Sequence, residues 1–425
     1  MNNKNPSQVR LALVSLLAVI ALLAACSSEE IKPPENQASA DKTAPSAPPA
    51  APQAVPIPVL AHDEAVLKAA NDLFSKAQLA NDTPGQQPRR PVVIDPLVDG
   101  VSRMQTATTR KMESKISGLV QSKFPQFDVR PFSAANLGQS PLLVVGTFTP
   151  INQQGKTEGV REMYRFCLVL VDLKSRRIVS KAVARSRMES VDPTPLPFFS
   201  DAPVWARDQT GEAYVATCQA SKLGDEVNPA YVDSLVADTL INEGIRAYNS
   251  AHYKDALALF VKAEATPAGK QLRTLTGSYL ATGKLGRRQE NAQAFGKIVD
   301  YGLDAGKLSL LLTFRPGATS LHGGTATAPY DMWLKTLAQH AAQRSSCMEV
   351  VGHASRGGPE PVNERLSALR AEHVRQRLVD EAPALEKRLL AAGYGSRENL
   401  IGTGKDNASD ALDRRVEFRL LACQG

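Results

Sequence analysis

The chain has 425 residues, of which 43% are hydrophobic, 22% are charged and only 5% are aromatic, and its formal net charge is +7 at pH 7. This length is sufficient for two or three globular domains. The charge is modest, and basic residues are mixed with acidic ones throughout the chain, so the sequence predicts no nucleic-acid-binding surface and no nucleic-acid partner.

Residues 1–25 have the features of a cleaved targeting sequence. Lys4 and Arg10 supply positive charge, an apolar run follows, and the segment ends in LAA directly before Cys26. The run is shorter than the roughly 20 apolar residues of a transmembrane helix. The arrangement resembles the lipobox of bacterial lipoproteins, which implies that Cys26 becomes the acylated, palmitate-bearing N-terminus. The alternative is an ordinary signal peptide with an incidental cysteine.

The residues after Cys26 indicate where the protein would lie. Ser27 stands where an aspartate would favour the inner membrane, so the resemblance to lipoproteins implies the outer membrane, facing the periplasm. Residues 26–61 are rich in proline, alanine, serine and glutamate, a composition that cannot bury enough apolar surface to fold. We therefore expect a disordered, semi-extended tether.

Four further cysteines are present, namely Cys167, Cys218, Cys347 and Cys423. An even number in an exported chain indicates disulfides, with three possible connectivities. The predicted domain boundaries favour Cys167–Cys218 and Cys347–Cys423. A metal site is the alternative, but no two cysteines have CxxC spacing, so we expect no metal and no cofactor.

The first predicted domain spans residues 62–222. Apolar side chains recur at helical spacing from Val66 to Ala77 and from Thr108 to Val120. Strand patterns occur at residues 91–95, 127–130, 142–148, 163–171 and 177–186. The order strand, helix, strand, strand, hairpin predicts an α/β sandwich with a mixed sheet.

This element order resembles the small α/β domains of periplasmic assembly lipoproteins of the CsgG and LpoB type, without a diagnostic motif. Asp95 and Asp99 follow the first strand, where open α/β sheets often bind ligands. The alternative role for both carboxylates is turn and cap chemistry.

Residues 228–302 are predicted to be helical. Gly244, Tyr248, Ala256, Phe260 and Ala263 have a spacing close to that of a tetratricopeptide repeat. Because such repeats are stable only in groups of about three or more, we expect a helical connector that packs on its neighbours.

Residues 303–425 form the third predicted domain. Strands are expected at 308–314, 347–353 and 413–423, and helices at 329–343 and 363–379. Three motifs occur in this region: VGHASRGG at 351–358, NERLSALRAEHV at 363–374, and DRRVE at 413–417. Their sequence and order resemble the OmpA C-terminal family. The predicted fold is thus α/β multidomain, with a mixed-sheet domain, a helical connector and an OmpA-like α/β sandwich.

This resemblance implies noncovalent binding of peptidoglycan through the diaminopimelate of its stem peptide. Arg370 matches the ligand-binding arginine of the family, and a guanidinium suits a carboxylate because it forms two parallel hydrogen bonds. Asn363 matches a position that shapes the pocket and is expected to cap the long helix. His353 and Ala354 are expected to line the preceding loop.

The sequence departs from the family pattern at Ser355, where the family has an aspartate that pairs with the ligand ammonium. A charge-assisted hydrogen bond contributes roughly 1.5–3 kcal/mol, against about 1 kcal/mol for a neutral one. We therefore expect weaker or altered binding, with Glu360 as a candidate replacement acid. Arg414 and Arg415 are expected to pair with a loop or helix carboxylate.

Two functions remain open from the sequence. In the first, the protein links the outer membrane to the cell wall. In the second, residues 62–302 bind a protein partner, and the protein serves a secretion or wall-synthesis machine as an accessory factor. The sequence contains no GxSxG, HExxH, P-loop or CxxC motif, so we expect no enzymatic activity.

Overall fold

The computed structural model describes residues 57–79, 89–205, 207–312, 314, 317–319, 321, 329–400, 404 and 410–423. The predicted signal sequence, Cys26 and most of the predicted tether lie outside these residues. The predicted tether boundary at residue 61 is wrong, because Val59–Leu60 form strand β1 and pair with a strand of the main sheet. No helix within the described ranges is long and apolar enough to cross a membrane.

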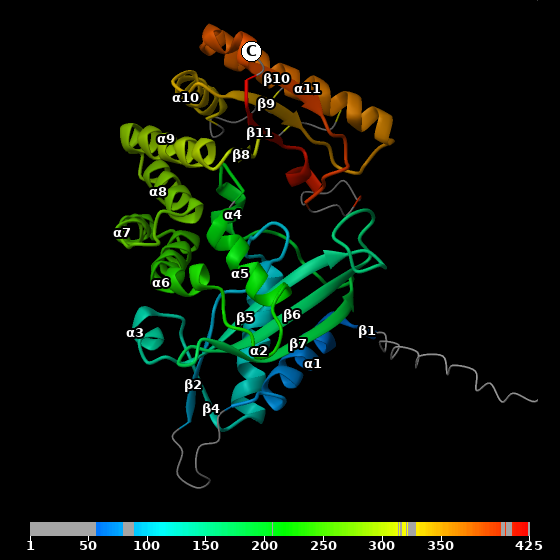
Figure 1. The fold of residues 1–425 in the computed structure, drawn as a ribbon, viewed down its shortest axis with the longest axis vertical. Helices are drawn as coiled ribbons and strands as arrows, with labels where there is room; N and C mark the ends of the chain where they lie inside the picture. Colours follow the sequence, from blue (N-terminus) through cyan, green and yellow to red (C-terminus); the bar gives the residue numbers. More distant parts are fainter. Residues whose placement is uncertain are drawn as a thin grey trace, which may run out of the picture. The chain divides into compact units, whose positions relative to one another are not determined.

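The first part of the chain is a seven-stranded mixed sheet with helices on both faces (Figure 1). Its strands are β1 (Val59–Leu60), β2 (Arg90–Ile94), β3 (Val98–Asp99), β4 (Phe127–Arg130), β5 (Leu142–Ile151), β6 (Met163–Asp172) and β7 (Arg177–Arg187). They lie in the order β1-β7-β6-β5-β2-β4, with β3 beside β5. β5, β6 and β7 are antiparallel, whereas β2 is parallel to both β4 and β5. The predicted mixed sheet is confirmed.

The helices of this part are α1 (His62–Ser75), α2 (Ala107–Lys123), α3 (Ala134–Leu137), α4 (Pro197–Asp201) and α5 (Gln209–Gln219). Two of them, α1 and α2, follow the predicted periodicity, and the three shorter ones were not predicted. α2 begins at Ala107 because Thr106 and Thr109 form a reciprocal capping box. α1 and α2 pack on one face of the sheet against Val92 and Val144, and α5 packs on the other against Val93 and Val145.

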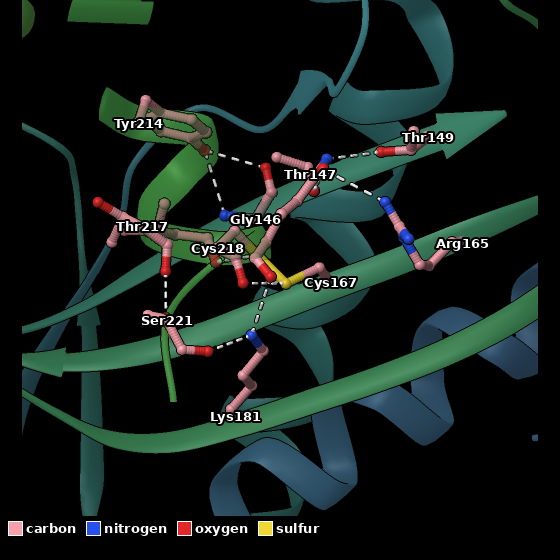
Figure 2. The surroundings of a disulfide bond; sticks show 12 residues. Gly146, Thr147, Thr149, Arg165, Cys167, Lys181, Tyr214, Thr217, Cys218 and Ser221 are labelled. Atoms are coloured by element: carbon pink, nitrogen blue, oxygen red, sulfur yellow. Dashed lines mark hydrogen bonds between the residues drawn. A yellow bond between two sulfur atoms is a disulfide. The ribbon is translucent and has the colours of Figure 1, made fainter. Parts of the chain in front are cut away.

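A disulfide joins α5 to the middle of the sheet (Figure 2). Cys167 on β6 and Cys218 on α5 are both buried, which confirms this predicted pairing. One turn earlier on α5, the Tyr214 hydroxyl donates to the carbonyl of Gly146 and accepts from its N–H. Lys181 on β7 donates to the carbonyl of Ser221, just beyond the helix. Covalent and polar contacts therefore hold the middle and the C-terminal end of α5 on the sheet.

The two aspartates after β2 have different surroundings. Asp99 accepts hydrogen bonds from the backbone N–H groups of Val101 and Ser102 and from the Ser102 hydroxyl, which is the turn role. Asp95 is buried and accepts a hydrogen bond from the Tyr231 hydroxyl. Burial raises the pKa of Asp95 to about 8, so this carboxyl is mostly neutral at pH 7.

Residues 229–304 form two helical hairpins. The helices are α6 (Pro229–Asn249), α7 (Tyr253–Glu264), α8 (Leu272–Lys284) and α9 (Arg288–Asp304). A β-carbon at Gly244 or at Gly277 would lie within 3 Å of the Phe260 ring. The two glycines therefore let α6 and α8 approach the ring of α7 from both sides. This is the small-residue and aromatic packing that the repeat-like spacing predicts.

The C-terminal part is a four-stranded sheet in the order β10-β9-β11-β8. Its elements are β8 (Lys307–Leu310), α10 (Tyr330–Ala342), β9 (Cys347–Gly352), α11 (Glu360–Glu381), a 3₁₀ turn (Pro383–Arg388), β10 (Leu389–Gly393), a second 3₁₀ turn (Asp410–Asp413) and β11 (Val416–Leu421). Strand β10 was not predicted, and the first strand ends four residues earlier than expected. The predicted Cys347–Cys423 disulfide is present, and it joins the ends of the two central strands, β9 and β11.

The helical hairpins and the C-terminal sheet share one hydrophobic core. The Phe295 ring on α9 stacks on Trp333 of α10, with ring centroids 5.6 Å apart. The Trp333 indole N–H donates to the hydroxyl of Tyr279 on α8 at 2.8 Å. His340 and Asp300 lie 2.7 Å apart between α10 and α9. The helical segment thus packs firmly on the C-terminal sheet.

Candidate functional site

The candidate site lies where β9 meets α11. Two glycines allow the helix to lie directly on the strands. A β-carbon at Gly352 would lie 2.0 Å from the Ser367 carbonyl oxygen, and one at Gly393 would lie 2.4 Å from the backbone nitrogen of Ala368. Ser367 is fully buried, and its hydroxyl accepts the Gly395 N–H at 2.9 Å. This close contact fixes α11, and with it Arg370, over the strands.

Backbone hydrogen bonds hold the start of the loop after β9. The N–H of His353 donates to the carbonyl of Arg415, and that of Ala354 donates to the carbonyl of Gly395. The side-chain amide of Asn399 donates to the Ala354 carbonyl at 3.0 Å. The two predicted loop residues, His353 and Ala354, are therefore buried and anchored by the backbone.

Ser355, at the acid position of the predicted site, is largely buried and faces a cation. The Arg414 guanidinium lies 3.4 Å from the Ser355 hydroxyl oxygen. Arg414 also adds positive charge beside Arg370. The structure thus places Arg414 near both Ser355 and Arg370. We had expected Arg414 only to pair with a carboxylate, and its proximity to these two residues was not predicted. The DRRVE motif marked the residue, but only the fold shows that it lies against the loop.

Arg370 projects from the middle of α11 and is fully buried. Its Nε donates to the Ala318 carbonyl at 2.9 Å, and its guanidinium lies 4.8 Å from the centre of the Phe314 ring. Burial and the nearby positive charge of Arg414 lower the pKa of Arg370 to about 10, so the group keeps its charge at neutral pH. A fixed, charged guanidinium is suited to binding a carboxylate.

Two local expectations for α11 are wrong. Asn363 does not cap the helix, because the helix begins three residues earlier, at Glu360, and Asn363 instead donates to the Gly358 carbonyl at 3.0 Å. Asn363 therefore fixes the shape of the loop before the helix. Glu360 does not replace the acid missing at Ser355, because its carboxylate accepts hydrogen bonds from the backbone and hydroxyl of Ser396.

A buried ion cluster lies next to the loop. Glu417 on β11 pairs with Arg415 at 2.9 Å and with Lys307 at 2.9 Å. Burial alone would raise the pKa of Glu417, but the adjacent cations hold it well below its usual range. The carboxylate that pairs with Arg415 is therefore on the strand, and not on a loop or helix as expected. This cluster fixes the start of β11, which begins two residues after Arg414.

His353, Glu398 and Glu417 lie close enough for one ligand atom of each to reach a common metal ion. Charge argues against a metal at this place. Arg419 pairs with both carboxylates, and Glu417 already pairs with Lys307 and Arg415, so three cations surround two anions. A divalent ion here would meet a net positive field.

The buried His353 predicts acid sensitivity. Burial and the charge of Arg415 lower the pKa of its imidazole from 6.5 to about 3. Below pH 6.5 the unfolded chain binds this proton and the folded chain does not, so the contribution of His353 to the free energy of unfolding should fall as the pH is lowered, by up to about 1.4 kcal/mol per pH unit. Thermal unfolding between pH 7 and pH 5 measures this slope.

The His353→Gln variant should reduce that slope. Buried His62 on α1, whose pKa is also lowered by burial, contributes in the same direction, whereas Asp95 and Glu113, whose pKa values are raised, contribute in the opposite direction, so the difference between variant and wild type is the quantity to compare. His252→Gln changes an exposed histidine and serves as the matched control. A slope that is the same in the His353 variant and in the wild type would contradict the buried, neutral state of His353.

Comparison with known proteins agrees with this geometry in the C-terminal part. Residues 313–412 match the OmpA family. The OmpA-like domain thus includes α10, β9, α11 and the loop that carries His353, Ala354 and Ser355. The matched region ends just before the DRRVE motif.

Outer membrane porin F of Pseudomonas fluorescens is 39% identical over 93 residues, which cover 21% of this chain and 27% of the porin. The chain thus spans about a quarter of the length of this curated relative.

Solved structures of low sequence identity also resemble the chain. The peptidoglycan-associated lipoprotein of Burkholderia pseudomallei is 22% identical, with 26% of this chain and 88% of that chain covered and a TM-score of 0.23. The cell wall anchor of the T6SS from Pseudomonas aeruginosa is 18% identical, with 30% and 96% covered and a TM-score of 0.24. The periplasmic domain of Helicobacter pylori MotB is 17% identical, with 28% and 76% covered and a TM-score of 0.23.

Proposed function

We propose that this protein anchors the cell envelope, with its OmpA-like domain bound noncovalently to peptidoglycan and a lipid on Cys26 held in the outer membrane. The observation that carries the proposal is the position of Arg370. It matches the ligand-binding arginine of the family and lies, fixed and charged, beside the β9–α11 loop. The lipobox-like N-terminal sequence supports the membrane end of the link.

The chemistry of the loop fits one half of a diaminopimelate group better than the other. A carboxylate would meet the positive charges of Arg370 and Arg414, whereas an ammonium would meet the neutral hydroxyl of Ser355. Recognition should therefore depend mainly on the carboxylate. Asn363 and Ala354 contribute by fixing the loop through backbone contacts.

Cosedimentation with purified sacculi tests the proposal. The full chain should sediment with a diaminopimelate-containing wall, and it should do so less with a wall whose stem peptides carry lysine at that position, because lysine lacks the second carboxylate. The full chain is needed because the helical hairpins share the core of the OmpA-like domain. Equal recovery from both walls, or no sedimentation with either, would refute recognition of diaminopimelate.

Restoring the acid at residue 355 should strengthen wall binding. The Ser355→Asp variant places a carboxylate where the ligand ammonium is expected, and the gain of a charge-assisted bond over a neutral one is about 1 kcal/mol, or roughly fivefold in affinity. Arg414 competes for the new carboxylate and limits the gain.

The control for this change is Ser345→Asp, which adds the same charge at an exposed position between α10 and β9. Sacculus binding curves for the two variants measure the difference. If Ser355→Asp binds no more tightly than Ser345→Asp, Ser355 does not face the ligand.

A protein partner for residues 62–302 is the second candidate function. The specific observation in its favour is that the seven-stranded sheet, with its disulfide-fixed helix α5, takes no part in the proposed wall site. Crosslinking in cells from exposed positions of this sheet and its helices should capture a specific envelope protein. Capture of wall fragments alone would leave the anchor as the single function.

A further inference from the structure

A cleft of about 440 Å³ opens at the carboxyl ends of β2 and β4. Its floor includes Ile94, the last residue of β2, and Arg130, the last residue of β4. Its walls come from α2 on one side and α6 on the other. A cleft of this volume is large enough for a small organic ligand.

The connections that follow β2 and β4 go to opposite faces of the sheet at this position. β2 leads through the short strand β3 into α2, whose apolar side chains pack on one face of the sheet. The neighbouring parallel strand β4 leads into α3, whose Leu137 packs on the opposite face, together with Tyr231 and Leu235 of α6. Where the connections of adjacent parallel strands separate to opposite faces, open α/β sheets leave a crevice that binds ligands.

Two arginines face each other across this cleft. Arg110 is exposed on α2, and Arg246 is exposed on α6. Within the part of the chain that the structure describes, neither guanidinium makes a hydrogen bond or an ion pair. Both attract the carboxylate of Glu113 electrostatically. Burial raises the pKa of Glu113 to about 7, so this acid cancels only part of their charge at neutral pH.

Two buried amides in the cleft also lack partners. Gln105 is 5% exposed and Asn242 is 8% exposed, and both line the cleft. Among the described residues, neither side chain makes a hydrogen bond. Their amide atoms are accessible from the cleft, so the pair is available to a polar ligand in the space that they face. Their combined donors and acceptors suit an amide or peptide group.

The sequence of α2 carries the same signal. Arg110, Ser114, Ser117 and Gln121 recur at spacings of four, three and four residues and line the cleft, whereas Met112, Ile116, Leu119 and Val120 form the core stripe. One face of the helix therefore serves the core, and the other presents a cation, two hydroxyls and an amide to the cleft.

We propose that this cleft binds a small ligand with a carboxylate and at least one amide group, of the kind found at the C-terminus of a short peptide. Arg110 and Arg246 hold the carboxylate, Gln105 and Asn242 pair with the amide, and Phe132 and Pro131 contact the apolar part. The site is outside the OmpA-like domain, so it does not depend on wall binding.

Calorimetric titration of the full chain with N-acetyl-Ala-Ala tests the charge requirement. The matched probe is the same dipeptide with a C-terminal amide, which lacks only the carboxylate. We expect the acid to bind at least tenfold more tightly than the amide, and more tightly than inorganic phosphate. Equal binding of acid and amide, no binding of the acid at millimolar concentration, or tighter binding of phosphate would overturn the proposal.

Variants locate the binding event. The double change Arg110→Ala and Arg246→Ala should weaken binding of the acid at least tenfold with an unchanged melting temperature, because both side chains are exposed. Asn242→Ala should weaken the acid and the amide probe by a similar factor. Lys111→Ala removes a cation from the next position of α2, outside the cleft, and should leave affinity unchanged. Loss of affinity in the Lys111 variant, or none in the double variant, would contradict the assignment.

Discussion

Replacing Arg370 with alanine is expected to reduce sacculus binding by roughly tenfold to a hundredfold. The reason is that a charge-assisted contact to a ligand carboxylate contributes about 1.5–3 kcal/mol, and each 1.4 kcal/mol changes affinity tenfold. Ser355 is neutral, so its side chain supplies no charged contact that offsets the loss. Cosedimentation of the full-length variant with sacculi across a concentration series measures the change.

Arg370 also has a structural role, and the experiment has to separate the two. The side chain is buried, donates to the Ala318 carbonyl and lies over the Phe314 ring, so its removal leaves a cavity and a carbonyl without this donor. Arg370→Lys keeps the charge but loses the paired geometry. We expect it to fold as the wild type does and still to lose affinity.

Arg365→Ala is the matched control for both variants. Arg365 is exposed on the same helix, five residues before Arg370, and its removal changes the net charge by the same amount as Arg370→Ala does. Unchanged binding in the control, together with reduced binding in a folded Arg370→Lys variant, would assign the effect to the site. If Arg370→Lys and Arg365→Ala bind equally to the wild type, Arg370 does not contact the ligand.

Much of the fold could be predicted because it is local. The apolar spacing from Val66 to Ala77 predicts α1, and the run from Leu142 to Phe148 predicts most of β5. The segments that were missed lack such a signal. β10 has the sequence LLAAG, with no polar alternation, and α5 has the sequence QTGEAYVATCQ, with no continuous apolar stripe. Each is fixed by its neighbours instead, β10 by pairing with β9 and α5 by its disulfide to β6.

The candidate site was predicted through its motifs, but its polar contacts were not. Arg370 and Ser355 stand in recognisable sequence patterns, whereas the contact between Arg414 and Ser355 joins residues 59 positions apart. The start of α11 was also mispredicted. Asn363 has the side chain of a capping residue, but the prolines at 359 and 361 allow the helix to begin earlier. Long-range side-chain partners depend on the fold as a whole, and one sequence does not specify them.

Breaking the buried ion pair between α6 and α8 is expected to be the most destabilising single change considered. Asp238 on α6 and Arg273 on α8 lie 2.8 Å apart, and Gln271 and Ser234 donate further hydrogen bonds to the Asp238 carboxylate. Burial raises the pKa of Asp238, and Arg273 opposes this shift. Arg273→Met would leave a buried carboxylate without its cation, at a cost of about 3–5 kcal/mol.

The pH dependence gives this prediction a second readout. Without Arg273, burial should hold the pKa of Asp238 above its unfolded value of 3.8, so the folded variant binds a proton more tightly than the unfolded chain does. The free energy of unfolding of the variant should therefore rise as the pH is lowered from 8 towards 5. Urea unfolding, followed by hydrogen exchange within α6 and α8, measures it at each pH.

Adding Asp238→Asn to the Arg273→Met variant should recover much of the lost stability, because the amide removes the buried charge and keeps an acceptor for Ser234. Arg288→Met changes an exposed arginine of α9 and should have an effect of only a few tenths of a kcal/mol. A loss in Arg273→Met no larger than in this control, or no recovery in the double variant, would show that the pair does not hold the hairpins. Since α8 also contacts the OmpA-like domain through Tyr279 and Trp333, loosening this pair should lower hydrogen-exchange protection in α10 as well.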